Sequence, residues 1–406
     1  MKEQLFKTVQ ALEPDMLETL SALIAIPAIN PNDGGEGEYR KGLYLADKLR
    51  ELGFGEPEIY NSPDPKAAGG VRPNIIVRMP GRTSKRLWII SHTDVVPEGE
   101  RSLWNTDPFK AEIKDGKIYG RGSNDNCQEL VSSLYAAVAL KKNNIVPEYE
   151  VCLCMVADEE VGSKHGISYL IDKNLFKDDD LVIVPDGGNE KGDFIEVAEK
   201  SICWIEFEVK GEQVHASTPD LGNNACRAAN EFSVVLDKAL HEAFPETDEL
   251  FSPAGSTFEP TRRNANVPNV NTVPGREVFC FDCRVLPTIP LEEVMSVVNS
   301  VIKEISDKYK VEISYTFPQK EQAPAPTPSD APIVGILLDA VKEVLPVTPK
   351  VGGVGGGTCA AFFRRSGVPA VVWCQEADCA HMPNEYAVIE HIINESKIFA
   401  LMMCGK

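Results

Sequence analysis

The sequence of 406 residues lacks an apolar run long enough to cross a membrane. Its most apolar early stretch, residues 20–29, is interrupted by Pro27 and is far shorter than the ~20 residues that a spanning helix needs. Residues 1–13 mix charged and apolar side chains, so they lack the basic start and the continuous apolar run of a secretory signal. We therefore expect a soluble protein that works in the cytoplasm.

Positive charge is also scarce. The chain has 41 lysines and arginines against 61 aspartates and glutamates, which gives a formal net charge of −20. Nucleic acids and anionic membrane surfaces are bound by basic surfaces. The composition therefore argues against both as the main partner, and it leaves acidic side chains that can line a cation site.

The eleven cysteines do not suggest a disulfide framework, because they are scattered along a long chain and odd in number. Cys280 and Cys283 form a Cys-x-x-Cys pair, but residues 278–285 read as a strand, in which residues three apart point to opposite faces. No second Cys or His pair lies nearby, so we expect reduced thiols in the core. The glycine-rich stretch 352–357 likewise lacks the Gly-Lys-Ser/Thr of a phosphate-binding loop.

The chain is too long for one ordinary domain of ~150 residues, so two or three domains are expected. In the first half, short apolar runs alternate with helical patterns, which predicts a largely parallel sheet with helices on both faces. The predicted strands are residues 74–79, 87–90, 149–157 and 181–184. The predicted helices are residues 4–26, 36–52 and 126–142.

The pattern changes near Lys200 to a compact α+β unit of strand, helix, strand, helix and strand. Its predicted elements are residues 202–210, 224–244, 277–285, 291–308 and 310–317, with proline- and asparagine-rich turns over 257–274. After a proline-rich hinge, the tail resumes the first pattern, with helices at 332–344, 358–366 and 387–403 and a strand at 369–374. We therefore expect an α/β catalytic domain made of residues 1–199 and 319–406, with an α+β domain inserted at 200–318.

Acidic residues and histidines follow the predicted strands, at the edge where sites form in open α/β sheets. The segments that reach this edge contain His92 and Asp94, Asp125, Glu159 and Glu160, Asp186, and His381. Taken singly, each has an ordinary explanation: Asp125 suits a helix N-cap, and a pair of glutamates is usually solvated. Together their carboxylates would repel one another unless cations lay between them. The set therefore predicts a metal centre.

These motifs, in this order, resemble the dizinc aminoacylase and carboxypeptidase family of metallopeptidases, the M20 family. The matching segments are residues 92–97, 120–125, 158–162, 186 and 380–385, and in the inserted domain 211–219 and 271–274. That family includes acetylornithine deacetylase, succinyl-diaminopimelate desuccinylase, aminoacylase and several di- and carboxypeptidases. The resemblance implies a zinc-peptidase-like catalytic domain and gives the inserted domain the role of lid and dimerisation domain.

The resemblance also implies two zinc ions, for which cobalt can substitute. Asp125 would bridge the two ions. His92 and Asp186 would complete the ligands of one ion. Glu160 and His381 would complete the ligands of the other. Imidazole and carboxylate are ligands that suit zinc.

Further roles follow from the same resemblance. Asp94 would orient His92, and Glu159 would be the general base. His215 of the inserted domain would stabilise the oxyanion in the partner subunit's site, which implies a homodimer through that domain. The positions that resemble substrate-holding ones in the family are Asn271, Arg284, Gly357 and Thr358.

Two positions depart from the family pattern. Asp125 is followed by Asn-Cys-Gln where many members have Lys-Gly, and Asp186 stands where many deacylases and carboxypeptidases have glutamate. Aspartate is commoner there in the amino- and dipeptidase branches. We expect a deacylase that hydrolyses the amide bond of a small N-acyl amino acid, or alternatively a dipeptidase or aminopeptidase. A non-catalytic ligand-binding relative is the remaining alternative, and the presence of every ligand and of the base argues against it.

Overall fold

The computed structural model of the chain describes residues 2–405, which form two compact units. The first unit comprises the chain up to Val197, Thr327–Gly352 and the chain from Thr358 onward. The second comprises Ala198–Pro326 and Gly353–Gly357. The sequence places the inserted domain at residues 200–318, and the second unit extends beyond both of these boundaries and takes in a short later segment.

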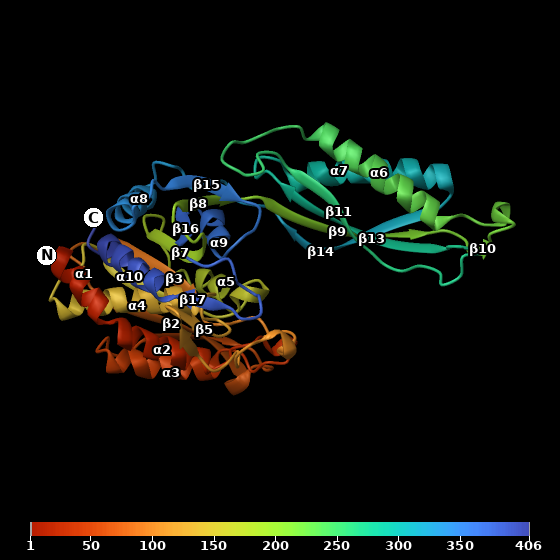
Figure 1. Cartoon of the computed structure of the whole chain (residues 1–406). Helices are drawn as coiled ribbons and strands as arrows, with labels where there is room; N and C mark the ends of the chain where they lie inside the picture. The colour runs from red at the N-terminus through yellow and green to blue at the C-terminus, as the bar shows by residue number, and fades with distance from the viewer. Residues whose placement is uncertain (1, 406) are drawn as a thin grey trace. The chain divides into compact units, whose positions relative to one another are not determined.

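The first unit is built on an eight-stranded sheet with the order β1-β2-β6-β3-β7-β16-β8-β15 (Figure 1). Its strands are β1 Glu58–Pro63, β2 Val71–Met79, β3 Arg86–His92, β6 Glu150–Val156, β7 Leu181–Gly188, β8 Phe194–Glu199, β15 Lys350–Val354 and β16 Ala370–Cys374. The four central strands, β6, β3, β7 and β16, are parallel, whereas β1, β2 and β8 pair antiparallel beside them. The predicted α/β class with a mostly parallel sheet is confirmed, although β1, β8 and β15 were not anticipated.

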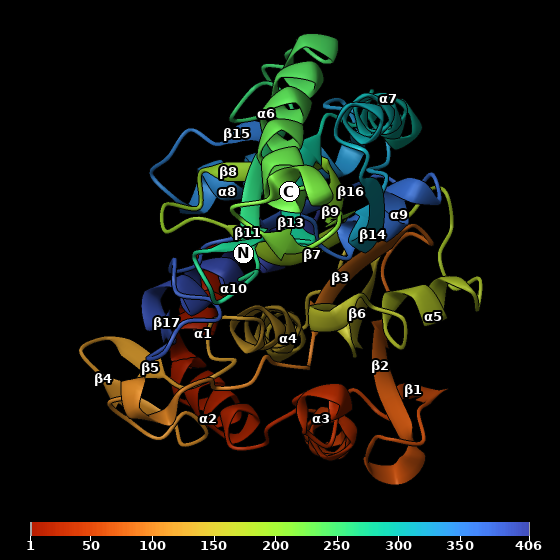
Figure 2. The same cartoon turned by 90° about the vertical axis from the view of Figure 1, so that its right-hand side faces the viewer.

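Helices cover both faces of this sheet, as its apolar strands require. The helices of the unit are α1 Lys2–Ala11, α2 Glu13–Ile24, α3 Tyr39–Glu51, α4 Cys127–Lys142, α5 Ile167–Ile171, α8 Pro332–Val344, α9 Ala360–Arg365 and α10 Ile389–Met403. α4 and α10 pack together on one face, and α5 and α9 lie on the other (Figure 2). The helix predicted over residues 4–26 is in fact two helices, because Pro14 has no backbone N–H to continue the first.

A small antiparallel sheet lies apart from the main one in this unit, in the order β17-β5-β4. Its strands are β4 Glu112–Lys114, β5 Lys117–Tyr119 and β17 Tyr386–Val388. It holds the segment before Asp125 beside the segment after His381. None of the helices within residues 2–405 combines the length and the apolar character that a membrane crossing requires.

The second unit is a four-stranded antiparallel sheet, β11-β13-β9-β14, with two helices on one face. Its elements are β9 Ser201–Lys210, α6 Ala225–Ala243, β11 Thr257–Arg263, β13 Arg276–Val285, α7 Leu291–Tyr309 and β14 Glu312–Glu321. Alternate residues of β9 enter the core, where Phe207 meets Phe232 of α6 with ring centroids 4.9 Å apart. The turns predicted over 257–274 begin instead with β11, an edge strand, where Pro260 is tolerated because no outer neighbour needs its N–H.

Candidate metal centre

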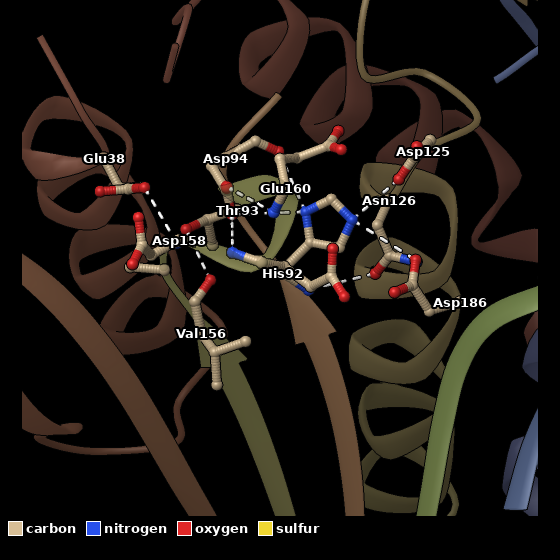
Figure 3. A network of polar contacts seen from close by, with 12 residues as sticks. Glu38, His92, Thr93, Asp94, Asp125, Asn126, Val156, Asp158, Glu160 and Asp186 are labelled. Atoms are coloured by element: carbon tan, nitrogen blue, oxygen red, sulfur yellow. Dashed lines mark hydrogen bonds and ion pairs between the residues drawn. The ribbon is translucent and has the colours of Figure 1, made fainter. Parts of the chain in front are cut away.

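Three neighbouring parallel strands end at one edge of the main sheet (Figure 3). β3 ends at His92, β6 ends at Val156, and β7 continues past Asp186. The register pairs His92 with Val156, and Thr93 donates to the carbonyl of Val156 from both its backbone N–H (2.9 Å) and its hydroxyl (3.0 Å). The loops after β3 and β6 therefore leave the sheet side by side, as the sequence predicts for strand-end residues.

Asp125 lies between two histidines. His92 Nε2 is 2.8 Å from Asp125 Oδ1, and His381 Nε2 is 3.1 Å from Asp125 Oδ2. Each imidazole has a second carboxylate beside it. Asp186 Oδ1 is 3.4 Å from His92 Nε2, and Glu160 Oε2 is 3.0 Å from His381 Nε2. The two oxygens of Asp125 thus face two separate imidazole–carboxylate pairs.

This donor set fits divalent cations. One donor atom each from His92, Asp125 and Glu160 lies within 4.8 Å of the others, and the same holds for His92, Glu159 and Asp186. The Oε1 atom of Glu160 is buried and has no hydrogen-bond partner. Burial and the charge of Asp125 raise the pKa of Glu160 to about 7, a sign of carboxylate repulsion that a cation between the groups relieves.

The two imidazoles are strongly basic in this setting. Hydrogen bonds from the ring to Asp125 and Glu160 raise the pKa of His381 to about 10. Burial alone would lower the pKa of His92, but Asp186 and Asp125 raise it well above its ordinary value. Because a histidine must be unprotonated to hold a metal, cations and protons compete for these rings.

Asp94 secures both His92 and the turn that carries the two glutamates. His92 Nδ1 donates to the backbone carbonyl of Asp94 at 3.0 Å, and the Asp94 carboxylate is 3.5 Å away. The two carboxylate oxygens of Asp94 accept the backbone N–H groups of Glu159 and Glu160, each at 3.1 Å. Asp94 therefore braces the turn as well as the imidazole, a second contact that the sequence did not predict.

Glu159 lies beside the centre, with one carboxylate oxygen within 4.8 Å of donor atoms of His92 and Asp186. Burial and the neighbouring charge of Asp186 raise its pKa well above the ordinary value. The turn that carries Glu159 begins at Asp158, whose carboxylate lies 3.2 Å from the buried guanidinium of Arg72. Arg72 also pairs with the buried carboxylate of Glu38.

Two further side chains hold the Asp125 turn. Glu385 is fully buried and accepts the backbone N–H of Asn124 at 2.9 Å and that of Asp125 at 3.1 Å. Its other oxygen accepts Arg121 Nη1 at 2.6 Å, and Arg121 Nη2 reaches the carbonyl of His381 at 3.3 Å. This pair ties the turns of Asp125 and His381 together. Both residues lie in segments that match the family, and their contact appears only in the three-dimensional structure.

Asn126 and Cys127, which follow Asp125 where many family members have Lys-Gly, have structural roles. Asn126 donates to Asp186 Oδ1 at 3.2 Å and accepts the backbone N–H of His92 at 3.2 Å, so it links two predicted site residues. The side chain of Lys41 in α3 is buried and lies 3.8 Å from Cys127 Sγ. An ammonium group is therefore present at this turn, supplied from another helix.

The predicted residues of the inserted domain form a separate group. His215 pairs with Thr272 in a two-stranded ribbon, β10 Val214–His215 with β12 Thr272–Val273, and the carbonyl of Asn271 accepts the N–H of Ala216 at 2.9 Å. Arg284 is already engaged: it donates to Asp282 at 2.6 and 3.0 Å and to the carbonyl of Gly355 at 2.8 Å. Gly357 closes the second unit and Thr358 resumes the first.

Comparisons with known proteins agree with this geometry. Residues 88–404 match the model of peptidase family M20/M25/M40. The chain is 43% identical over 399 residues to a protein of Methanocaldococcus jannaschii described as an uncharacterised metallohydrolase, covering 93% of this chain and 96% of that one. It is 27% identical over 384 residues to succinyl-diaminopimelate desuccinylase of Rickettsia bellii, covering 92% of each.

The same fold occurs in human carnosine dipeptidase 1, with a TM-score of 0.71 at 18% identity over 100% of this chain and 99% of that one. The match to the family model covers most of the chain, and the 43% identical relative is matched over nearly its whole length. The chain thus belongs to peptidase family M20/M25/M40 and is a metal-dependent hydrolase of peptide or amide bonds.

Proposed function

We propose that the protein is a dinuclear zinc hydrolase that removes the acyl group from a small N-acyl amino acid. The observation that carries the proposal is the position of Asp125, whose two oxygens face His92 at 2.8 Å and His381 at 3.1 Å. A carboxylate held in this way is suited to bridge two cations. Similarity to a desuccinylase over nearly the whole chain favours an acylated amino acid as the substrate.

The proposed ligands divide between two positions that share Asp125. His92 and Asp186 serve one position, while Glu160 and His381 serve the other. Metal ions held by these residues would acidify a water molecule and polarise the scissile carbonyl. Cobalt suits the same nitrogen and oxygen donors.

Glu159 is the proposed general base. It takes a proton from the attacking water and passes it to the leaving nitrogen, which frees the amino acid. The hydrogen bond from its backbone N–H to Asp94 fixes the start of its side chain, and burial favours its accepting a proton. Glu160 follows directly in the chain but points to His381, so the adjacent glutamates are free to perform different tasks.

His215 is the proposed oxyanion donor, acting in the site of the partner subunit of a homodimer. Its ring supports this role, because the backbone N–H of Ser217 donates to Nδ1 at 3.2 Å and the Ser217 hydroxyl lies 2.7 Å from the same atom. A neutral imidazole that accepts at Nδ1 carries its proton on Nε2. The exposed ring therefore presents an N–H outward, as an oxyanion requires.

Asn271, Gly357 and Thr358 are the proposed contacts to the substrate backbone, and Arg284 is the proposed contact to its carboxylate. Arg284 pairs with Asp282 in the present arrangement. A substrate carboxylate would therefore use the remaining N–H groups of the guanidinium or replace Asp282 in the pair.

Dipeptidase or aminopeptidase activity is the second candidate, and Asp186 favours it. The family resemblance implies this preference, because aspartate at this position is commoner in those branches. A test that separates the candidates is a side-by-side assay of the zinc-loaded protein on N-acetyl and N-succinyl amino acids and on dipeptides with a free amino terminus. Release of the amino acid from acylated substrates alone supports deacylation, whereas turnover of free dipeptides alone overturns it.

A further inference from the structure

A second group of possible metal donors lies outside the five proposed ligands. One donor atom each from Glu129, Cys374 and Glu376 lies within 4.8 Å of the others, the same limit that the residues around Asp125 satisfy. Glu129 is in the first turn of α4, Cys374 ends β16, and Glu376 follows β16. The group therefore sits between a helix end and a strand end that the fold holds rigidly.

One donor atom of this group is buried without a hydrogen-bond partner. Glu129 has no exposed surface, and its Oε2 atom makes no hydrogen bond. Its other oxygen accepts Gln128 Nε2 at 2.9 Å, and the Oε1 atom of Gln128 is also buried and unpartnered. A buried carboxylate oxygen left in this state is costly unless a proton or a cation meets it.

Within residues 2–405, no lysine or arginine forms an ion pair with Glu129, Glu376 or the adjacent Glu395. Glu395 has its own donors, since it accepts hydrogen bonds from Gln128, Ser132 and the backbone of Gln375. Glu129 accepts a hydrogen bond at one oxygen, and Glu376 has Asn124 Nδ2 at 3.4 Å, so both carboxylates keep oxygens that can accept a cation.

We propose that Glu129, Cys374 and Glu376 bind one further divalent transition-metal ion of the zinc or cobalt class. A thiolate donor selects zinc or cobalt over magnesium or calcium, and three protein donors leave a fourth position for water. Donor atoms around a tetrahedral zinc ion lie roughly 3.3–3.7 Å apart, so the side chains need to move by at most about an ångström on binding. Glu376 is only partly buried and has room to make that movement.

The group is linked to the turn that carries Asp125. Asn124 Nδ2 lies 3.4 Å from Glu376 Oε2 and donates to the carbonyl of Ala377 at 3.1 Å, and the Asn124 Oδ1 atom accepts the N–H of Ala377 at 3.2 Å. Asn124 directly precedes Asp125. A metal ion that draws Glu376 inward therefore acts on the position of the bridging aspartate through one residue.

Cobalt provides a probe that reports on this group alone. The proposed ligands around Asp125 are nitrogen and oxygen donors, so a thiolate-to-cobalt charge-transfer band reports a cysteine ligand, and loss of the band in a Cys374 variant assigns it to this group. Metal-free full-length protein in a thiol-free reductant is titrated with Co²⁺, and the near-ultraviolet absorption is recorded. We expect a band that saturates at one thiolate-bound ion per chain and a total of three bound ions per chain.

The variants sharpen this test. Cys374→Ser should remove the band and lower the bound cobalt by one ion, and Glu129→Gln should weaken binding of that ion at least ten-fold. Cys359→Ser, another buried cysteine of the same unit, is the matched control and should keep the band. A wild-type spectrum without the band, or a band that survives in Cys374→Ser, overturns the proposal. Visible cobalt bands without the thiolate band support the site at Asp125 and contradict the site at Cys374. A thiolate band without other bound cobalt supports the site at Cys374 and contradicts the site at Asp125.

Discussion

One carboxylate oxygen of Asp94 accepts the backbone N–H of Glu159 at 3.1 Å, so the residue that braces the metal-centre histidine also anchors the proposed base. The other oxygen performs the same task for the next residue of the turn. The chain thus fixes an imidazole and the proposed base through one buried residue. A change at Asp94 therefore acts on both.

Replacement of Asp94 by Asn should lower kcat/KM by about 10–100-fold, the usual effect of altering a group that orients a metal ligand. An amide can accept only one of the two N–H groups and presents a donor to the other. Steady-state assays combined with metal analysis check this result. Asp33→Asn, an exposed change, is the control, and an Asp94→Asn enzyme with wild-type activity would refute the bracing role.

Glu159→Gln should keep the bound metal and lose turnover by at least ~10²–10⁴-fold, because the amide cannot take a proton from water. The neighbouring substitution Glu160→Gln is the contrast, since it should lower metal content first. Metal analysis and kcat measured on the same preparations separate the two effects. Near-normal turnover in Glu159→Gln would show that another group is the base.

Glu385→Gln should destabilise the protein by ~3–5 kcal/mol, because it leaves the buried guanidinium of Arg121 without its charge partner. The shift in the urea midpoint of the metal-free protein measures this loss. Asp107→Asn breaks the exposed ion pair with Arg101 (3.2 Å) and should cost at most ~1 kcal/mol. Equal losses of stability in the two variants would contradict the conclusion that the Arg121–Glu385 pair is buried and the Arg101–Asp107 pair is exposed.

Stability should also depend on pH through Glu196, whose pKa burial raises from 4.5 to about 7 despite the nearby Arg364. The folded state then holds a proton that the unfolded state releases, so stability is full below pH 4.5 and falls as pH rises toward 7. Glu196→Gln cannot lose this proton. The unfolding free energy of the variant relative to wild type should therefore rise by up to about 3 kcal/mol between pH 5 and 8. A constant difference across that range would rule out the shift.

The proposed role of His215 predicts complementation. His215→Ala and Glu159→Gln should each be inactive as homodimers. In a mixed dimer, one site keeps Glu159 from its own chain and His215 from the other, and random pairing makes half of the dimers mixed, so up to about a quarter of wild-type activity should return. A verified mixed dimer without activity would place the action of His215 within its own chain or outside catalysis.

Short-range patterns predicted the strand ends that carry His92 and Asp186 and the turn before a helix that carries Asp125. They did not predict the contact between Arg121 and Glu385, because these residues are 264 positions apart and no local pattern records such a pairing. The edge strand β11 was mistaken for turns since its proline and two arginines suit a turn as well as a solvent-facing edge. What the sequence leaves open is thus mainly which distant side chains meet.

The strand order of the main sheet also sets the sequence of events as the chain is made. β7 and β8 are consecutive in the chain, yet β16 pairs with both of them. The position of β16 between β7 and β8 therefore stays empty while more than a hundred further residues are synthesised. During that time one edge of β7 has unpaired backbone N–H and C=O groups. The second unit lies between β8 and β16 in the sequence and has a hydrophobic core of its own. We therefore expect it to fold before β16 is synthesised. Nascent chains stalled before residue 370 should thus be the form that most needs chaperone protection.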